Sequence, residues 1–171
     1  MKTVSDYITT IPDFPTKGIL FRDITTVLSD ADGLQLAIDE MCKLVDKDKI
    51  DVICGIEARG FLFGMTMAYA MHKPFVMVRK AGKLPRETVS QSYDLEYGTA
   101  TIEIHADAIQ KGQRVCVVDD LMATGGTSMA CAKIVESLGG TVEQFVFLSE
   151  LTDLPGRENL SGYHVDSVVK F

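Results

Sequence analysis

The sequence has no tryptophan, and aromatic residues make up only 8% of its 171 residues. Histidine is also scarce, with three residues that lie far apart, so no spacing typical of a zinc site is present. The four cysteines form no CxxC pair. Cys54 and Cys116 lie in the apolar stretches "DVICGI" and "RVCVV", which predicts buried free thiols rather than metal ligands.

Positive charge is limited as well. Lysine and arginine number 17 against 24 acidic residues, giving a net charge of −7, which argues against a general nucleic-acid partner but allows a local basic site. No apolar run reaches the roughly 18 residues of a membrane span. The opening "MKTVSDYITTIPDFP" has no apolar core of signal-peptide length. We therefore expect a cytoplasmic protein that binds neither nucleic acid nor membrane.

What the sequence does contain is an alternation of strand and helix patterns. Apolar residues recur at helical spacing from Leu34, with Asp30 or Asp32 available as a cap. The helices are predicted at 34–47, 60–71 and 128–140, and the strands at 51–56, 75–78, 99–105, 114–118, 141–150 and 164–171. No linker divides the chain, so residues 1–171 are expected to form a single domain. The pattern predicts an α/β fold with a mostly parallel central sheet flanked by helices, which binds ligands at the carboxyl ends of its strands.

The stretch "VVDDLMATGGT" follows this rule at residues 117–127. Asp119 and Asp120 are predicted at the carboxyl end of the strand 114–118, before a turn of small residues and a helix that begins near Thr127. The exposed N–H groups of a helix start form an anion site, and small residues let a phosphate approach them. Carboxylates instead suit a vicinal diol. Phosphate and diol together describe a ribose 5-phosphate. A plain strand–turn–helix with an aspartate cap is the alternative, which the paired acids disfavour.

No lysine follows the glycines, so the stretch is not a Walker motif. It resembles the PRPP-binding motif of the type I phosphoribosyltransferases. In that family the two acids hold the ribose hydroxyls and the turn holds the 5-phosphate. The resemblance assigns these roles to Asp119 and Asp120, and to the turn residues Ala123, Thr124, Gly125, Gly126 and Thr127.

Four further stretches resemble the adenine phosphoribosyltransferase family: "FPTKGILFRDITTVL", "GIEARGFLFG", "RKAGKLP" and "YDLEYGTATIEIH". They occur in the family's order, and the likeness covers nearly the whole chain. Two positions depart from the family's pattern: Thr16–Lys17, where a proline is common, and Met122, where leucine is usual. The resemblance implies a type I fold with a small hood from the N-terminal segment. It also implies transfer of 5-phosphoribosyl from PRPP to adenine, giving AMP and pyrophosphate. It further implies a homodimer. We find no protein cage for a metal, so Mg²⁺ is expected to arrive with PRPP.

Basic residues gather in "RKAGKLPR" of this acidic chain. Taken alone, the segment fits a solvated loop equally well. Beside a phosphate motif this segment is typical of a pyrophosphate clamp. The candidate pyrophosphate-binding residues are Arg79, Lys80 and Lys83 of this segment, and Arg59 of the earlier stretch "IEARGF". The family's loop at Arg59 often contains a non-proline cis peptide, which corresponds here to Glu57–Ala58.

Recognition of the base is assigned by the resemblance alone. Phe21, otherwise a plausible core residue, becomes one face of a sandwich around adenine, with Leu121 on the other. Backbone groups of Leu20 and Arg22 read the edge of the base. The polar segment "SQSYDLEYGT", otherwise a simple connection, becomes a lid with Tyr97, and Glu96 becomes the candidate acid/base near purine N7.

Two rival functions remain open at this point. An enzyme for another base, such as xanthine or hypoxanthine, shares the PRPP motif, but "LEYG" and "FRDI" favour adenine. A PRPP-sensing regulator shares the fold but adds a DNA-binding domain. The segment before "ILFRDI" is too short for a helix-turn-helix module, and the net charge is acidic.

Overall fold

The computed structural model describes residues 2–171. They form two compact units, residues up to Glu40 and residues Met41–Phe171. The first unit contains a 3₁₀ turn (Val4–Tyr7), β1 (Thr9–Pro12), β2 (Leu20–Asp23) and α1 (Thr25–Leu28). Helix α2 (Ala31–Lys43) crosses the boundary in sequence. Within residues 2–171, none of the helices has the length and apolar character needed to span a membrane.

The first unit is a small two-stranded sheet. β1 and β2 pair antiparallel, with Ile11 opposite Phe21 and Pro12 opposite Leu20. The rings of Phe14 and Phe21 meet edge to face with centroids 5.0 Å apart. Helix α2 begins at Ala31, where the Asp30 carboxylate accepts the Gly33 N–H at 2.9 Å. The cap expected from the sequence is therefore Asp30, and the helix starts before Leu34.

The second unit is built on a seven-stranded sheet of order β5-β6-β4-β3-β7-β8-β9. Pairs β3–β4, β3–β7, β7–β8 and β8–β9 are parallel, whereas β6 pairs antiparallel with both β4 and β5. The strands are β3 (Val52–Ile56), β4 (Phe75–Lys80), β5 (Thr88–Asp94), β6 (Thr99–His105), β7 (Arg114–Met122), β8 (Thr141–Glu150) and β9 (Val165–Lys170). The predicted α/β fold with a mostly parallel sheet is confirmed.

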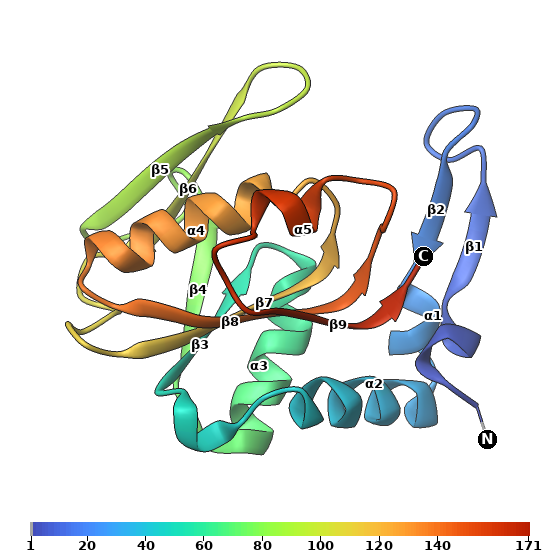
Figure 1. Cartoon of the computed structure of the whole chain (residues 1–171), viewed down its shortest axis with the longest axis horizontal. Coiled ribbons are helices and arrows are strands. Elements are labelled where there is room, and N and C mark those ends of the chain that lie inside the picture. The colour runs from blue at the N-terminus through green and yellow to red at the C-terminus, as the bar shows by residue number, and fades with distance from the viewer. Residues whose placement is uncertain (1) are drawn as a thin grey trace. The chain divides into compact units, whose positions relative to one another are not determined.

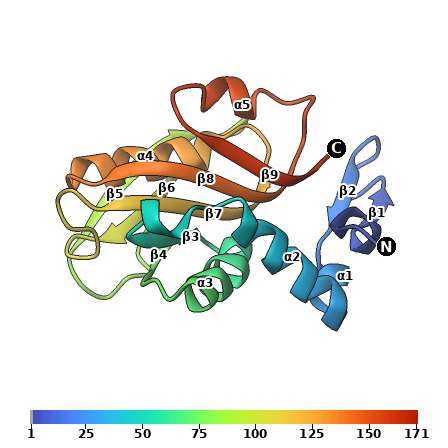
Figure 2. The same ribbon diagram turned by 60° about the horizontal axis from the view of Figure 1, so that its bottom comes forward.

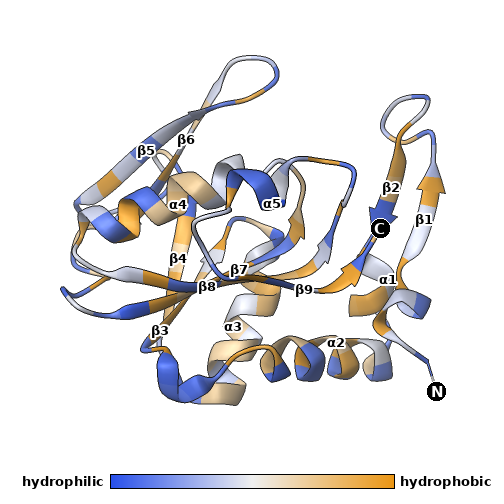
Figure 3. Cartoon of the chain, in the orientation of Figure 1, coloured by the Kyte–Doolittle hydropathy of each residue, from blue (hydrophilic) through white to orange (hydrophobic). Residues whose placement is uncertain are grey.

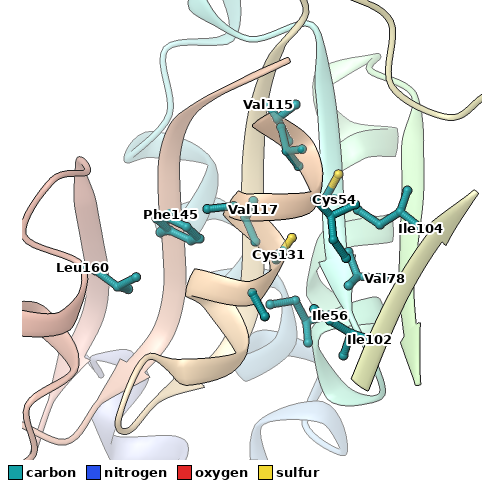
Figure 4. Packing of buried hydrophobic residues seen from close by; sticks show 14 of the residues in the cluster. Cys54, Ile56, Val78, Ile102, Ile104, Val115, Val117, Cys131, Phe145 and Leu160 are labelled. Atoms are coloured by element: carbon teal, nitrogen blue, oxygen red, sulfur yellow. The ribbon is translucent and has the colours of Figure 1, made fainter. Parts of the chain in front are cut away.

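Helices cover both faces of this sheet. Figures 1 and 2 show α4 (Gly126–Ser137) and the short α5 (Gly156–Asn159) on one face and α3 (Arg59–Met71) on the other. Figure 3 shows hydrophobic and hydrophilic residues alternating along α4, as expected for a helix with one buried side. Figure 4 shows Cys131 of α4 among side chains from the strands of the sheet. Cys54 and Cys116 are buried free thiols, as predicted.

Two sequence predictions need correction. β7 does not end at Val118 but runs through the acid pair to Met122, because β8 continues to pair with it, for example Leu121 with Ser149. The segment "SQSYDLEYGT" is not a single loop. Its first half belongs to β5, and only residues 95–98 form the turn of a β5–β6 hairpin. The catalytic and lid candidates therefore lie at a hairpin tip.

Candidate active site

The acid pair lies where the ends of the two central strands meet. β3 and β7 are parallel neighbours with Gly55 opposite Val118, so the loop after β3 comes alongside Asp119 and Asp120. A cavity of about 370 Å³ opens at this edge. It is lined by Glu57, Ala58, Arg59, Asp119, Asp120 and Leu121. The structure thus brings together four residues predicted from the sequence: Arg59, Asp119, Asp120 and Leu121.

Asp120 is buried and paired with Arg59. Its side chain is 7% exposed, and its Oδ2 lies 2.7 Å from Nε of Arg59. Arg59 is the first residue of α3, and Gly60 follows it. A Cβ on Gly60 would lie 2.8 Å from Oδ1 of Asp119 and 2.9 Å from the Val118 carbonyl oxygen. Glycine at this position allows α3 to pack against β7 closely enough for Arg59 to reach Asp120.

Asp119 occupies a different electrostatic environment. Its Oδ1 accepts the Asp120 N–H at 2.8 Å. Burial of its carboxyl group, together with the nearby negative charge of Asp120, raises the pKa of Asp119 well above its ordinary value of 3.8. The site therefore holds a carboxyl group whose ionisation a bound cation or a set of hydroxyl donors would favour.

Glu57 links the cavity to the basic segment. Its Oε2 accepts the Lys80 N–H at 2.8 Å and lies 3.3 Å from Nε of Arg79. Burial raises the pKa of Glu57, but these two partners outweigh it and the net pKa is lowered. Arg79 also donates to the carbonyl oxygen of Lys83 at 3.3 Å. Arg79, Lys80 and Lys83 thus form one connected group. The peptide bond Glu57–Ala58 is cis, as the sequence resemblance predicted.

The turn after β7 leads directly into α4. Gly125 is the residue before the helix and has φ of +80°, a conformation that favours glycine. The turn borders a small cavity of about 90 Å³, which Asp119 also lines. All five turn residues predicted from the sequence line it: Ala123, Thr124, Gly125, Gly126 and Thr127. The unpaired N–H groups of the α4 start therefore lie beside the acid pair, as the sequence predicted.

Helix α5 contacts the turn after β7, a contact that the sequence did not predict. Asn159 Nδ2 donates to the Thr124 carbonyl oxygen at 2.7 Å. A Cβ on Gly156 would lie 2.5 Å from the Ala123 carbonyl oxygen. Arg157 holds the helix in place through the buried carboxylate of Glu150, with Nη2 at 2.7 Å from Oε2. The only sequence signal was the Pro-Gly pair at 155–156, which indicates a turn but no partner.

The β5–β6 hairpin carries the lid candidates. Its turn is closed by the Leu95 N–H, which donates to the Gly98 carbonyl oxygen at 2.9 Å. Glu96 is exposed at the tip and Tyr97 is 88% exposed. Figure 1 shows the hairpin extending past α4. One contact that the sequence did not indicate joins the hairpin to the turn after β7: Thr127 Oγ1 donates to the Tyr93 hydroxyl at 2.9 Å.

The candidate base-binding residues fall in both units. Leu20, Phe21 and Arg22 lie on β2 of the first unit, and Leu20 is 55% exposed. Leu121 lies on β7 of the second unit and is partly buried. The adenine sandwich inferred from the sequence stays a prediction.

Comparison with known proteins identifies the family. A model of the phosphoribosyl transferase domain matches residues 26–157. The adenine phosphoribosyltransferase of Agathobacter rectalis is 66% identical over 171 residues, covering 100% of this chain and 98% of that protein.

Solved structures show the same likeness. The adenine phosphoribosyltransferase of Thermoanaerobacter pseudethanolicus has a TM-score of 0.94 at 55% identity, covering 98% of both chains. That of Saccharomyces cerevisiae, complexed with D-2,5-dideoxy-2,5-imino-altritol 1,6-bisphosphate and adenine, has a TM-score of 0.92 at 39% identity, covering 96% of both. The chain therefore belongs to the adenine phosphoribosyltransferases, within the phosphoribosyltransferase family.

Proposed function

We propose that the chain transfers the 5-phosphoribosyl group from PRPP to adenine, giving AMP and pyrophosphate, at the carboxyl end of β7. The observation that carries this proposal is the acid pair on β7, with Asp120 buried, two residues before a turn that contains glycine and leads into α4. The family membership supports the reaction, and the yeast relative's complex with adenine and a bisphosphate supports the choice of ligands.

Within this site, the two ends of the ribose phosphate meet different chemistry. Asp119 and Asp120 accept hydrogen bonds from the ribose hydroxyls, since ionised carboxylates are acceptors only. The turn Ala123–Thr127 receives the 5-phosphate through backbone N–H groups and the hydroxyls of Thr124 and Thr127. The small cavity beside this turn, shared with Asp119, supports this arrangement.

The pyrophosphate is held by basic residues on the other side of the acid pair. Arg59, Arg79, Lys80 and Lys83 supply the positive charge, and a guanidinium can bind phosphate oxygens through two parallel hydrogen bonds. Arg59 is already engaged with Asp120. When substrate binds, Arg59 would exchange its ion pair with Asp120 for one with phosphate, and Asp120 would accept hydrogen bonds from the ribose hydroxyls instead.

Magnesium fits this site as part of the substrate. The donor chemistry is suitable, because Mg²⁺ prefers oxygen ligands and retains bound waters that would donate hydrogen bonds to the carboxylates of Asp119 and Asp120. When bound to PRPP, Mg²⁺ neutralises charge on the departing pyrophosphate. Within residues 2–171, no cluster of three or more His, Cys, Asp or Glu side chains is arranged around a metal position.

The side chains proposed to contact adenine are those of Phe21 and Leu121. Adenine is an uncharged base, so backbone groups of Leu20 and Arg22 suffice to read its edge. β2 is one strand of a two-stranded sheet, which leaves alternate backbone N–H and C=O groups pointing away from β1.

Proton transfer to or from the purine is assigned to Glu96, with Tyr97 beside it on the lid. Both are exposed at the hairpin tip, as expected for groups that reach the substrate only when the lid closes. Closure excludes water that would otherwise compete for the ribosyl group.

The working molecule is a homodimer. Support comes from an apolar surface on α3 and β4, where Leu62, Met65, Tyr69 and Met77 are between 43% and 87% exposed. A surface of this kind is typical of an interface. Light scattering after gel filtration should show a dimer, and Met65→Glu with Tyr69→Glu should shift it to a monomer. Leu154→Glu, at an exposed apolar residue elsewhere, should leave the mass unchanged.

We further propose that residues 1–171 act as a single domain and that the enzyme works in the cytoplasm. The test of the central function is direct. The protein is incubated with Mg²⁺, PRPP and one purine base at a time, and the nucleotide product is separated by chromatography. AMP from adenine, with little product from hypoxanthine, guanine or xanthine, is the expected result. Equal turnover of the other bases would overturn the assignment of specificity.

A further inference from the structure

Tyr93 connects the lid hairpin to the proposed phosphate cradle, defined here as Ala123–Thr127. Its hydroxyl oxygen accepts a hydrogen bond from the Thr127 hydroxyl, and the two oxygens are 2.9 Å apart. Its ring is half-buried against the core and lies over the start of α4, where a Cβ on Gly126 would be 3.5 Å from Tyr93 Cδ2. The contact therefore joins β5 to the first turn of α4 through both packing and a hydrogen bond.

Tyr93 and Thr127 each have one hydroxyl proton, which limits how the pair can bind a phosphate. A threonine hydroxyl has a single proton, and in this structure Thr127 donates it to Tyr93. The oxygens of an ionised phosphate are acceptors, so Thr127 must redirect its proton to bind one. When the Thr127 proton points to the phosphate, Thr127 Oγ1 can accept a hydrogen bond from Tyr93. Tyr93 has a proton of its own, and its oxygen lies 2.9 Å from Thr127 Oγ1, close enough to donate once its hydroxyl turns toward Thr127.

We propose that Tyr93 is a positioning residue for the 5-phosphate of PRPP, whose hydrogen bond with Thr127 reverses direction when the phosphate binds. The Tyr93 hydroxyl then donates to Thr127 Oγ1 and holds the threonine proton toward the phosphate. The inference rests on the proposed phosphate cradle and extends it by one residue from a different strand.

The same contact ties phosphate binding to the lid. β6 pairs with β4 at Arg79–Glu103 and Lys80–Ile102, and the Ala81 N–H donates to the Thr101 carbonyl oxygen at 3.0 Å; these bonds attach the hairpin to the rest of the sheet. Tyr93 lies opposite Ala100, beyond that attachment and close to the turn 95–98. A Thr127 hydroxyl that donates to an anionic phosphate becomes a better acceptor, so the Tyr93–Thr127 bond should strengthen and restrain the part of the hairpin that carries Glu96.

Steady-state kinetics of Tyr93→Phe, Thr127→Val and the double variant test the proposal. Tyr93→Phe should raise KM for PRPP about three- to tenfold, the range expected for one hydrogen bond, and leave kcat at saturation within about twofold. Thr127→Val should raise KM for PRPP further. The double variant should be no worse than Thr127→Val alone, because Tyr93 acts through Thr127.

The chain offers a matched control. Tyr163 also packs against the core, and its hydroxyl donates to Glu136 of α4 at 2.7 Å, away from the cradle. Tyr163→Phe removes the same chemical group and a hydrogen bond to the same helix. It should leave KM for PRPP unchanged, so a loss in Tyr93→Phe alone cannot come from general loosening of α4.

Hydrogen exchange gives a second readout, with ribose 5-phosphate as the probe. In the wild type the probe should slow exchange of the amides at residues 94–98, and in Tyr93→Phe this protection should be lost. An unchanged KM for PRPP in Tyr93→Phe would overturn the proposal. If Thr127→Val still raised that KM, only the link through Tyr93 would be wrong. If Thr127→Val were also without effect, the phosphate cradle itself would be misassigned, whatever AMP the wild type forms.

Discussion

Arg59 neutralises Asp120 directly: Nε of the arginine lies 2.7 Å from Oδ2 of a carboxylate that is 7% exposed. Each residue is assigned to a different part of PRPP, the arginine to pyrophosphate and the aspartate to the ribose hydroxyls. The two charges that we propose bind substrate thus stabilise each other in this structure. Removing one of them changes both binding and folding.

Arg59→Gln should therefore raise KM for PRPP and lower the free energy of unfolding. Asp120 would be left buried without its partner, which costs about 1–3 kcal/mol. Because Arg59 is itself 48% exposed, we expect the lower part of that range. Urea unfolding and PRPP kinetics measure the two effects. Arg114→Gln is the control, since it breaks the Arg114–Asp51 pair at the opposite end of β7 and should affect stability only. Normal PRPP kinetics in Arg59→Gln would contradict the pyrophosphate role.

Asp119→Asn and Asp120→Asn should each lower kcat/KM for PRPP by about tenfold or more. A hydrogen bond to a charged group is worth about 1.5–3 kcal/mol, and an amide replaces the charged acceptor in each variant. Initial rates at varied PRPP and saturating adenine measure the change. If both variants kept wild-type PRPP kinetics, the acid pair would not hold the ribose hydroxyls.

Asp119→Asn should also stabilise the protein free of substrate, and more so as the pH rises. The pKa of Asp119 is raised in the folded state, so folding favours its protonated form. The wild type therefore loses stability as pH increases from about 3.8, the ordinary value, up to the raised value in the folded protein. An asparagine does not titrate. The difference in Tm between variant and wild type should be smallest near pH 4 and grow toward pH 7; a constant difference would contradict the prediction.

Gly126→Ala should weaken PRPP binding while the protein stays folded. The sequence alone favours Gly125→Val for this test, but Gly125 needs a positive φ, and a Cβ there would lie 3.2 Å from the Gly156 carbonyl oxygen. A Cβ on Gly126 has no contact closer than 3.5 Å and lies 3.8 Å from Thr124 Oγ1, within the cradle. Calorimetry should show reduced affinity for PRPP at an unchanged Tm. Wild-type affinity would argue against phosphate binding at this turn.

Glu96→Gln should bind PRPP and adenine almost normally and lower the rate of the chemical step by about 10²–10⁴-fold, the range of general acid–base catalysis. Single-turnover measurement is needed, because product release can mask the chemical step. A chemical step within about threefold of wild type, with a raised KM, would reassign Glu96 to lid closure.

The control for this variant changes once the structure is considered. The sequence suggests Glu103→Gln, but Glu103 Oε2 accepts the Gly82 N–H of the basic segment at 3.2 Å. Asp94→Asn is a better match, because Asp94 is an exposed acid of the same hairpin. It should leave the chemical step unchanged.

The sequence predicts most of the sheet because buried strands are strongly patterned. "TVEQFVFLSE" and "TATIEIH" coincide with β8 and β6. β5 was missed because it is a polar edge strand, with one face and one edge that need no apolar residues. The end of β7 was misplaced because charged residues usually mark the end of a buried strand, whereas here backbone pairing with β8 continues past them.

The residues of the candidate site also differ in how well the sequence predicts them. Residues that act through their own chemistry, such as Asp119, Asp120 and Arg59, are visible in the sequence as charges at strand ends. Residues that support them are not. Asn159 and Tyr93 contact the turn after β7 from segments 35 and 34 positions away in sequence, and no local pattern indicates such a contact.

The close packing at Gly60 has a mechanical consequence. A Cβ on Gly60 would lie 2.9 Å from the Val118 carbonyl oxygen and 3.2 Å from Asp119 Cα, so the backbones next to Arg59 and at Asp119 are in close contact. The hairpin that carries the proposed lid pairs with β4 at Arg79–Glu103 and Lys80–Ile102, and its turn 95–98 lies beyond this pairing. We propose that the active site combines close packing at Gly60, which keeps the charges in place, with a hairpin turn whose movement closes and opens the site. Substitutions that loosen the packing at Gly60 should displace these charges. Substitutions that restrain the β5–β6 hairpin turn should slow the release of AMP.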